Sequence, residues 1–232
     1  MSSSTQTKRE KVAAREDAIV EAATRAFLHG GLRAARMAEI AKAADVAEGT
    51  LYLYFKNKEA LFSAVVARHW RDLTVGASEA VKTEETAIAQ LEALARFTLT
   101  RILGDWKLFE LTFALHYGSE DIEDVSDRRG YVQIFDRVIQ RGVGRGEFVP
   151  QYPIFRLRDL FFGTIEYAAR SALVREEPYH EAINEVIGML MGSMQTALFE
   201  AQRTETANLA DRLERSVVRL EALCLDHPST AG

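Results

Sequence analysis

Side chains able to recognise another molecule are concentrated in residues 37–61, with the sequence MAEIAKAADVAEGTLYLYFKNKEAL. Thr50, Tyr52 and Tyr54 carry hydroxyl groups, and Leu53 between the two tyrosines is apolar. Hydroxyl groups can donate hydrogen bonds to phosphate oxygens, and an apolar side chain can contact the methyl group of thymine. The stretch therefore offers the kinds of contact that proteins make with double-stranded DNA.

Two short helices are expected to position these side chains. They fit residues 37–44 and 48–55, and Asp45 lies at the turn between them, where Asp tolerates a left-handed backbone conformation. A longer helix from Arg15 comes before them and ends at the glycine pair 30–31. The inward positions are apolar and often small: Ile40, Ala41, Val46, Leu51 and Phe55. This pattern predicts a helix-turn-helix, whose second short helix lies in the DNA major groove.

The next helix is expected to begin at Lys58. Asn57 is its predicted N-cap, because an Asn side chain readily accepts a hydrogen bond from the first turn. Lys58 can pair with a phosphate there, beside the free N–H groups of the helix N-terminus.

Residues 15–62 resemble the DNA-binding domain of the TetR/AcrR family of bacterial one-component repressors. The matching residues are Ile19, Ala22, Ala23, Phe27, Gly31, Ile40, Ala41, Val46, Gly49, Thr50, Leu51, Tyr52, Tyr54, Phe55, Lys58 and Leu61. The resemblance implies a homodimer, in which each subunit has a three-helix DNA-binding head and a larger helical body that binds a small ligand. It also implies that ligand binding changes the spacing of the two heads and releases the operator.

The same resemblance implies that five residues occupy DNA-contacting positions: Thr50, Tyr52, Leu53, Tyr54 and Lys58. It places Glu48 where the base-reading side chains of the family vary. The complete predicted set of DNA-binding residues also includes Arg36, Ala47 and Gly49. Two interpretations of Glu48 stay open. Its carboxylate accepts a hydrogen bond from cytosine N4, or it only stabilises the helix N-terminus electrostatically.

Two positions lack a hydroxyl that the family pattern contains. Ala35 and Ala47 stand where Thr and Ser are usual, and each change removes a side-chain cap worth about 1 kcal/mol. Phosphate contacts expected from those hydroxyls must then come from other residues. Arg36, Lys8 and Arg9 are the candidates, the last two through the minor groove.

The composition indicates a helical protein around this motif. Of the 232 residues 47% are hydrophobic and 27% charged, and the first 149 contain no proline. Apolar residues recur at helical spacing, which predicts further helices over about 84–103, 106–118, 122–142, 153–175, 179–203 and 205–226. The longest run without a charged residue has 14 residues, too short to cross a bilayer. The single cysteine excludes an intramolecular disulfide. We expect an all-α, cytoplasmic protein without a membrane partner.

The charge and the motif together predict the domain organisation. Residues 1–58 hold 10 Lys and Arg against 7 Asp and Glu, whereas the remainder holds 19 against 27. Two explanations of this uneven charge are equally good: statistical scatter, or a basic head that is the only part of the protein to bind a polyanion. We expect a flexible basic arm over residues 1–10, a helix-turn-helix domain over 11–60 with a linking helix to about 75, and a ligand-binding and dimerisation domain over 76–232.

Aromatic side chains in the body predict a pocket for an apolar or amphipathic small molecule. The helix over 106–118 holds most of them, and others could line the facing wall. The predicted pocket residues are Trp106, Phe109, Glu110, Phe113, His116, Tyr117, Phe135, Phe161 and Phe162. The alternative is that these rings only fill the core, as large aromatic side chains often do.

The helix over 179–203 is apolar on several faces, which indicates burial on several sides. A second copy of the chain could provide that burial in a four-helix bundle, with Gly188 and Gly192 allowing close approach; the alternative is a core helix of a monomer. Paired heads that fit two DNA half-sites favour the dimer. The predicted dimer-interface residues are Ile165, Ala169, Ile183, Ile187, Leu190, Met191, Met194 and Leu198. The helix over 205–226 is amphipathic and is expected to pack on the body or on the partner.

We therefore expect a DNA-binding transcriptional regulator: a homodimeric repressor that a small ligand releases from a palindromic operator, in control of efflux or of lipid and catabolic genes. An all-α enzyme and a protein-binding adaptor that use the aromatic cavity are the alternatives. No catalytic residue is assigned, because the five histidines are scattered and no nucleophile has a recognisable base nearby. No metal or cofactor is expected, and the glycines of residues 142–146 follow a helix rather than the strand that a nucleotide loop needs.

Overall fold

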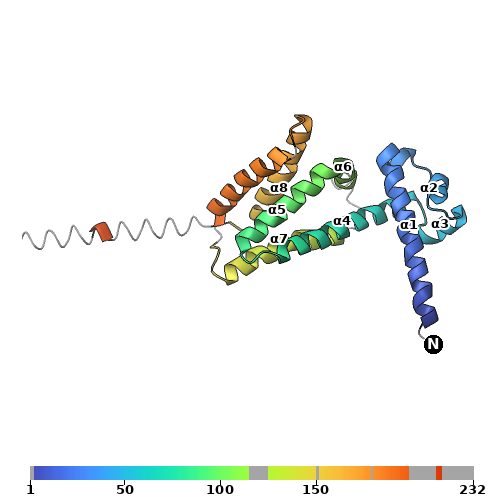
Figure 1. Ribbon diagram of the computed structural model, residues 1–232, viewed down its shortest axis with the longest axis horizontal. Helices are drawn as coiled ribbons and strands as arrows, with labels where there is room; N and C mark the ends of the chain where they lie inside the picture. Colours follow the sequence, from blue (N-terminus) through green and yellow to red (C-terminus); the bar gives the residue numbers. More distant parts are fainter. Residues whose placement is uncertain (1–2, 115–124, 150–151, 179, 199–212, 216–232) are drawn as a thin grey trace, which may run out of the picture. The chain divides into compact units, whose positions relative to one another are not determined.

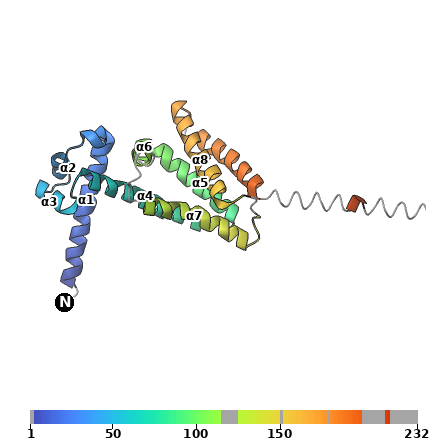
Figure 2. The ribbon, with the colours of Figure 1, turned by 180° about the vertical axis from the view of Figure 1, so that it is seen from behind.

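The computed structural model describes residues 3–114, 125–149, 152–178, 180–198 and 213–215. These residues form helices and no strand (Figures 1 and 2). The helices are α1 (Ser3–Ala34), α2 (Met37–Ala43), α3 (Glu48–Tyr54), α4 (Lys58–Lys82), α5 (Ala87–Gly104), α6 (Trp106–Ala114), α7 (Val125–Gly144) and α8 (Ile154–Val174), followed by a helix over residues 180–198. Within these ranges, none of the helices has the length and the apolar character that a membrane crossing requires. The prediction of an all-α fold is confirmed.

The chain divides into two compact units, and the division cuts through α5 and α7. The first unit comprises residues 1–83 and 97–135, and the second comprises residues 84–96 and 136–232. The first unit therefore contains the whole helix-turn-helix together with α4, α6 and half of each divided helix.

The core of the head, which we define as α1 to α3 with the first turns of α4, lies between α1 and the helices beside it. α1 packs against α4 and α2. Ile19 and Phe27 on α1 and Leu61 on α4 are almost fully buried, and the Phe27 and Phe62 rings meet edge to face at 5.3 Å. The predicted apolar stripe of α1 thus forms the interior of the head.

α1 begins earlier than the sequence pattern indicates. Residues 3–10, where we expected a flexible arm, are helical and continue into α1. The physical reason is composition, since this segment has no glycine or proline and includes the good helix formers Gln6, Lys8 and Glu10. Near its other end α1 has a non-helical residue, Gly31, with φ 72°. Glycine adopts this conformation without the strain that a Cβ would cause.

The remainder of the first unit has a buried polar contact among aromatic rings. Thr98 on α5 and Tyr131 on α7 share a hydrogen bond of 2.5 Å between their hydroxyl oxygens, and both side chains are buried. The Tyr131 ring lies 5.8 Å from the Trp70 ring of α4. Burial raises the pKa of the Tyr131 phenol, so it stays protonated and neutral.

The second unit is tied together at the start of α5 and along α8. The carboxylate of Glu147 accepts a hydrogen bond of 2.6 Å from the backbone N–H of Ala87, the first residue of α5. Asp136 on α7 accepts two hydrogen bonds from the Arg158 guanidinium on α8. This paired geometry raises the pKa of Arg158 and fixes α7 against α8.

Most predicted helices are found within a few residues of their expected ends. The predicted helix over 106–118 is described as α6 to Ala114, and its last four residues lie outside the described residues. Of the predicted helix over 205–226 only residues 213–215 are described, and they are helical.

Candidate nucleic-acid interface

α3 presents one exposed face and one buried face. Leu51 is fully buried, and Phe55 just after the helix is 7% exposed, so these two side chains anchor α3 to the head. On the other face, Tyr52 is 47% exposed and Leu53 is 85% exposed. Thr50 is partly exposed between these faces. A helix that presents large apolar and hydroxyl side chains to solvent has a surface suited to another molecule.

The turn between α2 and α3 has the expected geometry. Asp45 has φ 55°, which confirms the left-handed conformation predicted for it. The N–H of Ala44 donates to the carbonyl of Ile40 at 2.9 Å, and the N–H of Val46 donates to the carbonyl of Ala41 at 3.0 Å. These hydrogen bonds end α2 and direct the chain into α3 within a few residues.

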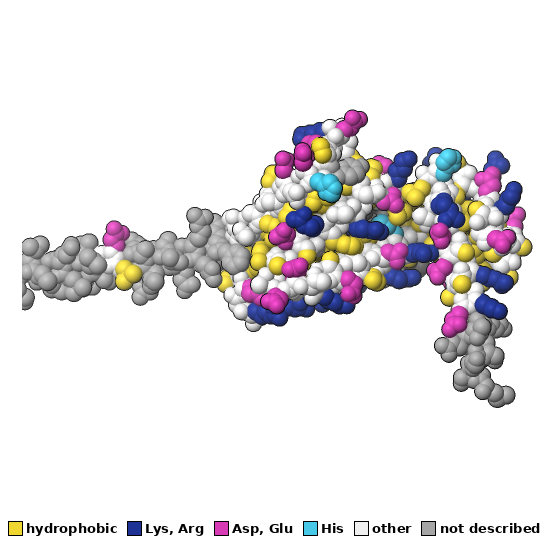
Figure 3. Space-filling model, in the orientation of Figure 1, with side chains coloured by type: hydrophobic (Ala, Val, Ile, Leu, Met, Phe, Trp, Pro, Cys, Tyr) yellow, Lys and Arg dark blue, Asp and Glu magenta, His cyan; other side chains and the backbone are white. Residues whose placement is uncertain are grey.

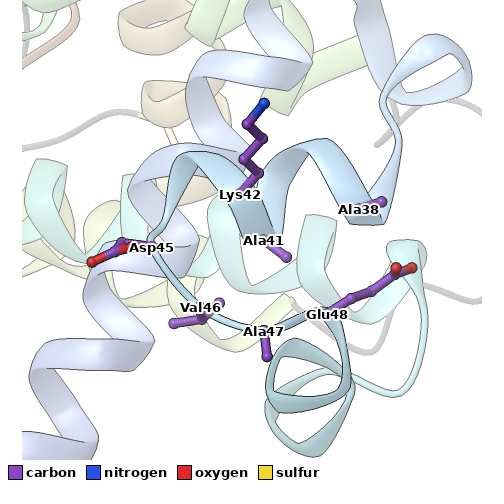
Figure 4. A pocket seen from close by; sticks show the side chains of 7 residues that line it. All are labelled: Ala38, Ala41, Lys42, Asp45, Val46, Ala47 and Glu48. Atoms are coloured by element: carbon purple, nitrogen blue, oxygen red, sulfur yellow. The ribbon is translucent and has the colours of Figure 1, made fainter.

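A shallow groove of about 460 Å³ lies between α2 and α3. Small side chains form most of its walls, and Asp45 and Glu48 lie on opposite sides of it in Figure 4. Its lining residues are Ala38, Ala41, Lys42, Asp45, Val46, Ala47 and Glu48. The groove leaves the backbone at the start of α3 accessible.

The starts of α2 and α3 lack side-chain caps. Ala47 is the N-cap of α3, as the sequence indicated, whereas the N-cap of α2 is Arg36 and not Ala35, which is buried just before it. Neither N-cap residue makes a side-chain cap hydrogen bond. Arg36 is exposed and lies 4.0 Å from the carboxylate of Glu39, a distance that leaves its guanidinium within reach of another partner. Asn57 does cap α4, since its side-chain oxygen accepts a hydrogen bond of 2.8 Å from the N–H of Ala60, and this prediction is confirmed.

Lys58 has a role inside the head that the sequence did not indicate. Its Nζ donates to the backbone carbonyls of Arg33 at 3.0 Å and Ala35 at 3.1 Å. A lysine ammonium has three N–H donors, so two of them tie the chain after α1 to the start of α4. The Lys58 ammonium therefore has at most one N–H donor left for the expected contact with a phosphate.

Exposed basic residues near α3 complete the surface. Lys42 on α2 and Lys56 after α3 are both exposed, and neither belongs to the predicted set of DNA-binding residues. Figure 3 shows dark-blue Lys and Arg side chains at several places on the head, with acidic side chains among them. These two lysines are identified as part of the exposed surface near α3 by the folded structure, and no sequence pattern indicated them.

The other predicted DNA-binding residues are also at the surface. Ala47, Glu48 and Gly49 are exposed, and Tyr54 is partly exposed. No atom lies within 4 Å of the position that a Cβ on Gly49 would occupy, so the backbone there is open to close approach. Each of these predicted residues is therefore at least partly exposed, and their contact with DNA stays a prediction.

The predicted pocket residues lie in both units. In the first unit, the rings of Trp106 and Phe109 are 5.5 Å apart, Phe135 is fully buried, and Glu110 is exposed. In the second unit, the rings of Phe161 and Phe162 meet edge to face at 5.1 Å. The side chain of Phe113 and the residues His116 and Tyr117 lie outside the described part of the chain. The pocket stays a prediction.

The predicted dimer-interface residues lie inside the second unit. All eight are buried within the single chain, and none is more than 8% exposed: Ile165, Ala169, Ile183, Ile187, Leu190, Met191, Met194 and Leu198. The exposed faces of the same two helices carry Tyr167, 77% exposed, and Met189, 73% exposed. Side chains that already pack inside one chain are not available to a second copy, so a dimer contact on these helices would use their exposed faces.

His69 on α4, in the first unit, is partly buried and uncharged. The Nε2 of His69 on α4 has no hydrogen-bond partner in the described part of the chain. Its pKa is lowered from 6.5 to about 4, because burial disfavours the charged ring. The positive charge of Arg101 lowers this pKa further, while Asp105 and Asp72 oppose the shift.

Comparison with known proteins agrees with this geometry. The family described as "Bacterial regulatory proteins, tetR family" matches residues 19–65, from the buried stripe of α1 into α4. The uncharacterized HTH-type transcriptional regulator YhgD of Bacillus subtilis is 30% identical over 145 residues, which cover 60% of this chain and 74% of that protein. The chain belongs to the TetR family.

Two further comparisons concern regulator proteins of Bacillus subtilis. The fatty acid metabolism regulator protein of Bacillus subtilis is 26% identical over 164 residues, which cover 69% of this chain and 84% of that protein. The crystal structure of the transcriptional regulator FadR from Bacillus subtilis, in complex with stearoyl-CoA, superposes with a TM-score of 0.64 at 26% identity. The superposed region covers 75% of this chain and 96% of the FadR chain.

As a TetR family member, the chain is a DNA-binding transcriptional regulator with operator DNA, a second copy of itself and a small-molecule ligand as partners. This membership favours the regulator over the enzyme and adaptor alternatives.

Proposed function

We propose that the chain represses genes of lipid metabolism and that a long-chain acyl-CoA releases it from its operator. The exposed face of α3 beside the alanine-lined groove is the observation that carries the DNA-binding part. The similarity to a fatty acid metabolism regulator and to a regulator bound to stearoyl-CoA supports the ligand class.

In this proposal residues 11–60 form the DNA-binding domain and residues 76–232 the ligand-binding and dimerisation domain. Thr50, Tyr52 and Leu53 enter the major groove, where hydroxyls reach phosphates and Leu53 meets a thymine methyl. Gly49 lets a DNA strand approach the start of α3. For the Glu48 carboxylate both alternatives stay open: it accepts a hydrogen bond from cytosine N4, or it stabilises the start of α3 electrostatically.

The dimer face lies on the exposed sides of α8 and of the helix over 180–198. Gly163 on α8 and Gly188 and Gly192 on the following helix are exposed, with no atom within 4 Å of a Cβ built on any of them. Glycine inside a helix costs about 1 kcal/mol relative to alanine, and nothing within the chain requires it at these positions. Close approach of a second copy gives these glycines a purpose.

The acyl chain is proposed to bind beside aromatic side chains of the first unit, which offer an apolar environment. Trp106 and Phe109, whose rings lie 5.5 Å apart, are the described candidates there. An acyl-CoA is amphipathic, which matches the ligand class that the aromatic residues indicated.

DNA binding and release test the proposal together. The full-length protein is titrated onto a duplex from its own upstream region, with stearoyl-CoA, stearic acid, acetyl-CoA or free CoA added. We expect stearoyl-CoA to release the duplex and acetyl-CoA and free CoA to leave it bound, because only a long acyl chain fills an apolar site. Release by none of the four compounds contradicts the ligand class, and transcription that rises with added protein contradicts repression.

Tyr52→Ala tests the DNA-binding face. We expect affinity for the duplex to fall by about tenfold, which corresponds to the loss of about 1.4 kcal/mol of contact free energy. Tyr152→Ala removes a similarly exposed tyrosine from the second unit, 51% against 47% exposed, and serves as the control. Equal affinity of the two variants would contradict the assignment of α3.

A further inference from the structure

The start of α1 extends beyond the packed part of the head. Residues 9–16 are helical, and all of them are exposed. Asp17 makes the first tertiary contacts: its carboxylate pairs with Arg68 of α4 at 3.6 Å, and its carbonyl accepts from the same guanidinium at 3.2 Å. The helix from Ser3 to Glu16 therefore projects by about 21 Å, at 1.5 Å per residue. Both views show this end of α1 projecting past α2 and α3 (Figures 1 and 2).

Charges are segregated around this projecting helix. Lys11 and Arg15 are one turn apart and continue the line of Ile19, the buried residue one turn further on. In the sequence Lys8 precedes Lys11 by three positions. Glu10 and Asp17 are seven positions apart, which is two turns, so they share a different face. One face is therefore basic, and an acidic face lies away from it.

The basic face is directed to the side of α1 on which the rest of the head lies. Ile19 is buried against the other helices of the head, and α1 packs on α2 and α4. Lys11 and Arg15 share this side, beyond the point where packing ends. Arg15 and Lys11 are thus one and two turns before a position that packs against the other helices of the head.

A projecting helix of this kind is not explained by packing within the chain. The eight helical residues 9–16 have no buried side chain, and a helix without a packed face is only marginally stable in water. A basic face on such a segment attracts a polyanion, and DNA is the polyanion that the same head binds.

We propose that Lys11 and Arg15 bind phosphates of operator DNA outside the half-site that α3 reads, so that the start of α1 forms a second DNA contact. This inference rests on the proposed function. Lys11 lies about 9 Å beyond Asp17 along the helix, so the contact extends the binding site by up to about three base pairs per subunit at 3.4 Å per base pair. It adds affinity without base specificity.

Duplex length is the variable that tests the inference. The operator, selected by the full-length protein from random duplexes, is made in two forms: one trimmed to the palindrome, the other with ten flanking base pairs on each side. We expect the wild-type protein to bind the long form more tightly. Lys11→Ala and Arg15→Ala should each weaken binding to the long form by about fivefold and reduce the salt slope by about 1, with little effect on the trimmed form.

Arg71→Ala is the control, because it removes the same charge from an exposed position of α4, outside the projecting segment. The inference is overturned if Lys11→Ala and Arg15→Ala bind the long form as tightly as the wild-type protein does, or if Arg71→Ala loses as much affinity as they do. The inference is also overturned if Lys11→Ala or Arg15→Ala changes the oligomeric mass of the protein in solution, because the segment would then contact the second subunit. Loss of binding to both duplex forms in Tyr52→Ala supports the proposed function separately, and absence of any duplex binding by the wild-type protein contradicts it.

Discussion

At the scale of single residues, Lys58 shows how one side chain can be drawn away from an expected role. Its ammonium binds the carbonyls of Arg33 and Ala35, and so connects the end of α1 to the start of α4. A substitution there would disturb the head as well as any phosphate contact. Tyr52 is the better probe of DNA binding, because its side chain is exposed and its neighbour Leu51 carries the packing.

His69 makes the stability of the protein depend on pH. The folded protein protonates His69 only near pH 4, whereas an unfolded chain does so near 6.5. Protons therefore bind preferentially to the unfolded state between these values, and stability should fall as the pH falls from 6.5 to 4. We expect His69→Gln to flatten this part of the curve of Tm against pH.

His29→Gln, at an exposed position of α1, is the control and should leave the wild-type slope unchanged. If Tm falls with pH as steeply in His69→Gln as in the wild-type protein, other groups cause the loss of stability in acid.

At the scale of elements, the junction of α5 and α7 depends on close packing around a glycine. A Cβ on Gly142 would lie 2.3 Å from the Phe148 ring and 2.9 Å from the Cβ of Ala87. Both neighbours are held in place, since Phe148 is buried and Ala87 is the residue whose N–H binds Glu147. A side chain at position 142 would therefore separate the end of α7 from the start of α5.

Gly142→Ala should lower the free energy of unfolding by about 1–3 kcal/mol, the usual cost of overpacking a filled core. Gly144→Ala is the matched control in the same helix, because no atom lies within 4 Å of its added Cβ. Urea denaturation of both variants at one protein concentration measures the difference. If Gly142→Ala is as stable as Gly144→Ala, the junction is not tightly packed in solution.

At the scale of the whole molecule, function requires two heads and therefore two chains. The exposed sides of α8 and of the helix over 180–198 carry Tyr167 and Met189 beside exposed glycines. Large exposed apolar side chains on adjacent helices are typical of a surface that another protein covers.

Tyr167→Glu and Met189→Glu should each convert the dimer to monomers, raising the dimer dissociation constant by at least about tenfold, because an unpaired carboxylate would be buried. Light scattering during size-exclusion chromatography measures the mass, and the affinity for the operator should fall with it. Val143→Glu, at an exposed apolar position of α7, is the control. Intact dimers in both variants would place the subunit contact elsewhere.

Local patterns in the sequence predicted most helices and most of the head. Helical spacing of apolar residues and capping residues such as Asn57 depend on neighbours within one or two turns, so most helix boundaries and the Asp45 turn followed from local physics, whereas the start of α1 did not. The outward position of Tyr52 and Leu53 followed in the same way, because the period of a short helix separates its buried and exposed faces.

Only the tertiary structure decided which contacts individual side chains make. Ile165 and Met191 lie on apolar faces that suit either a partner or the chain's own core, and packing within the chain buries them. Lys58 likewise binds carbonyls that are more than twenty positions away in sequence. Such outcomes depend on which helices meet in space, and the spacing of residues along a single helix contains no information about that.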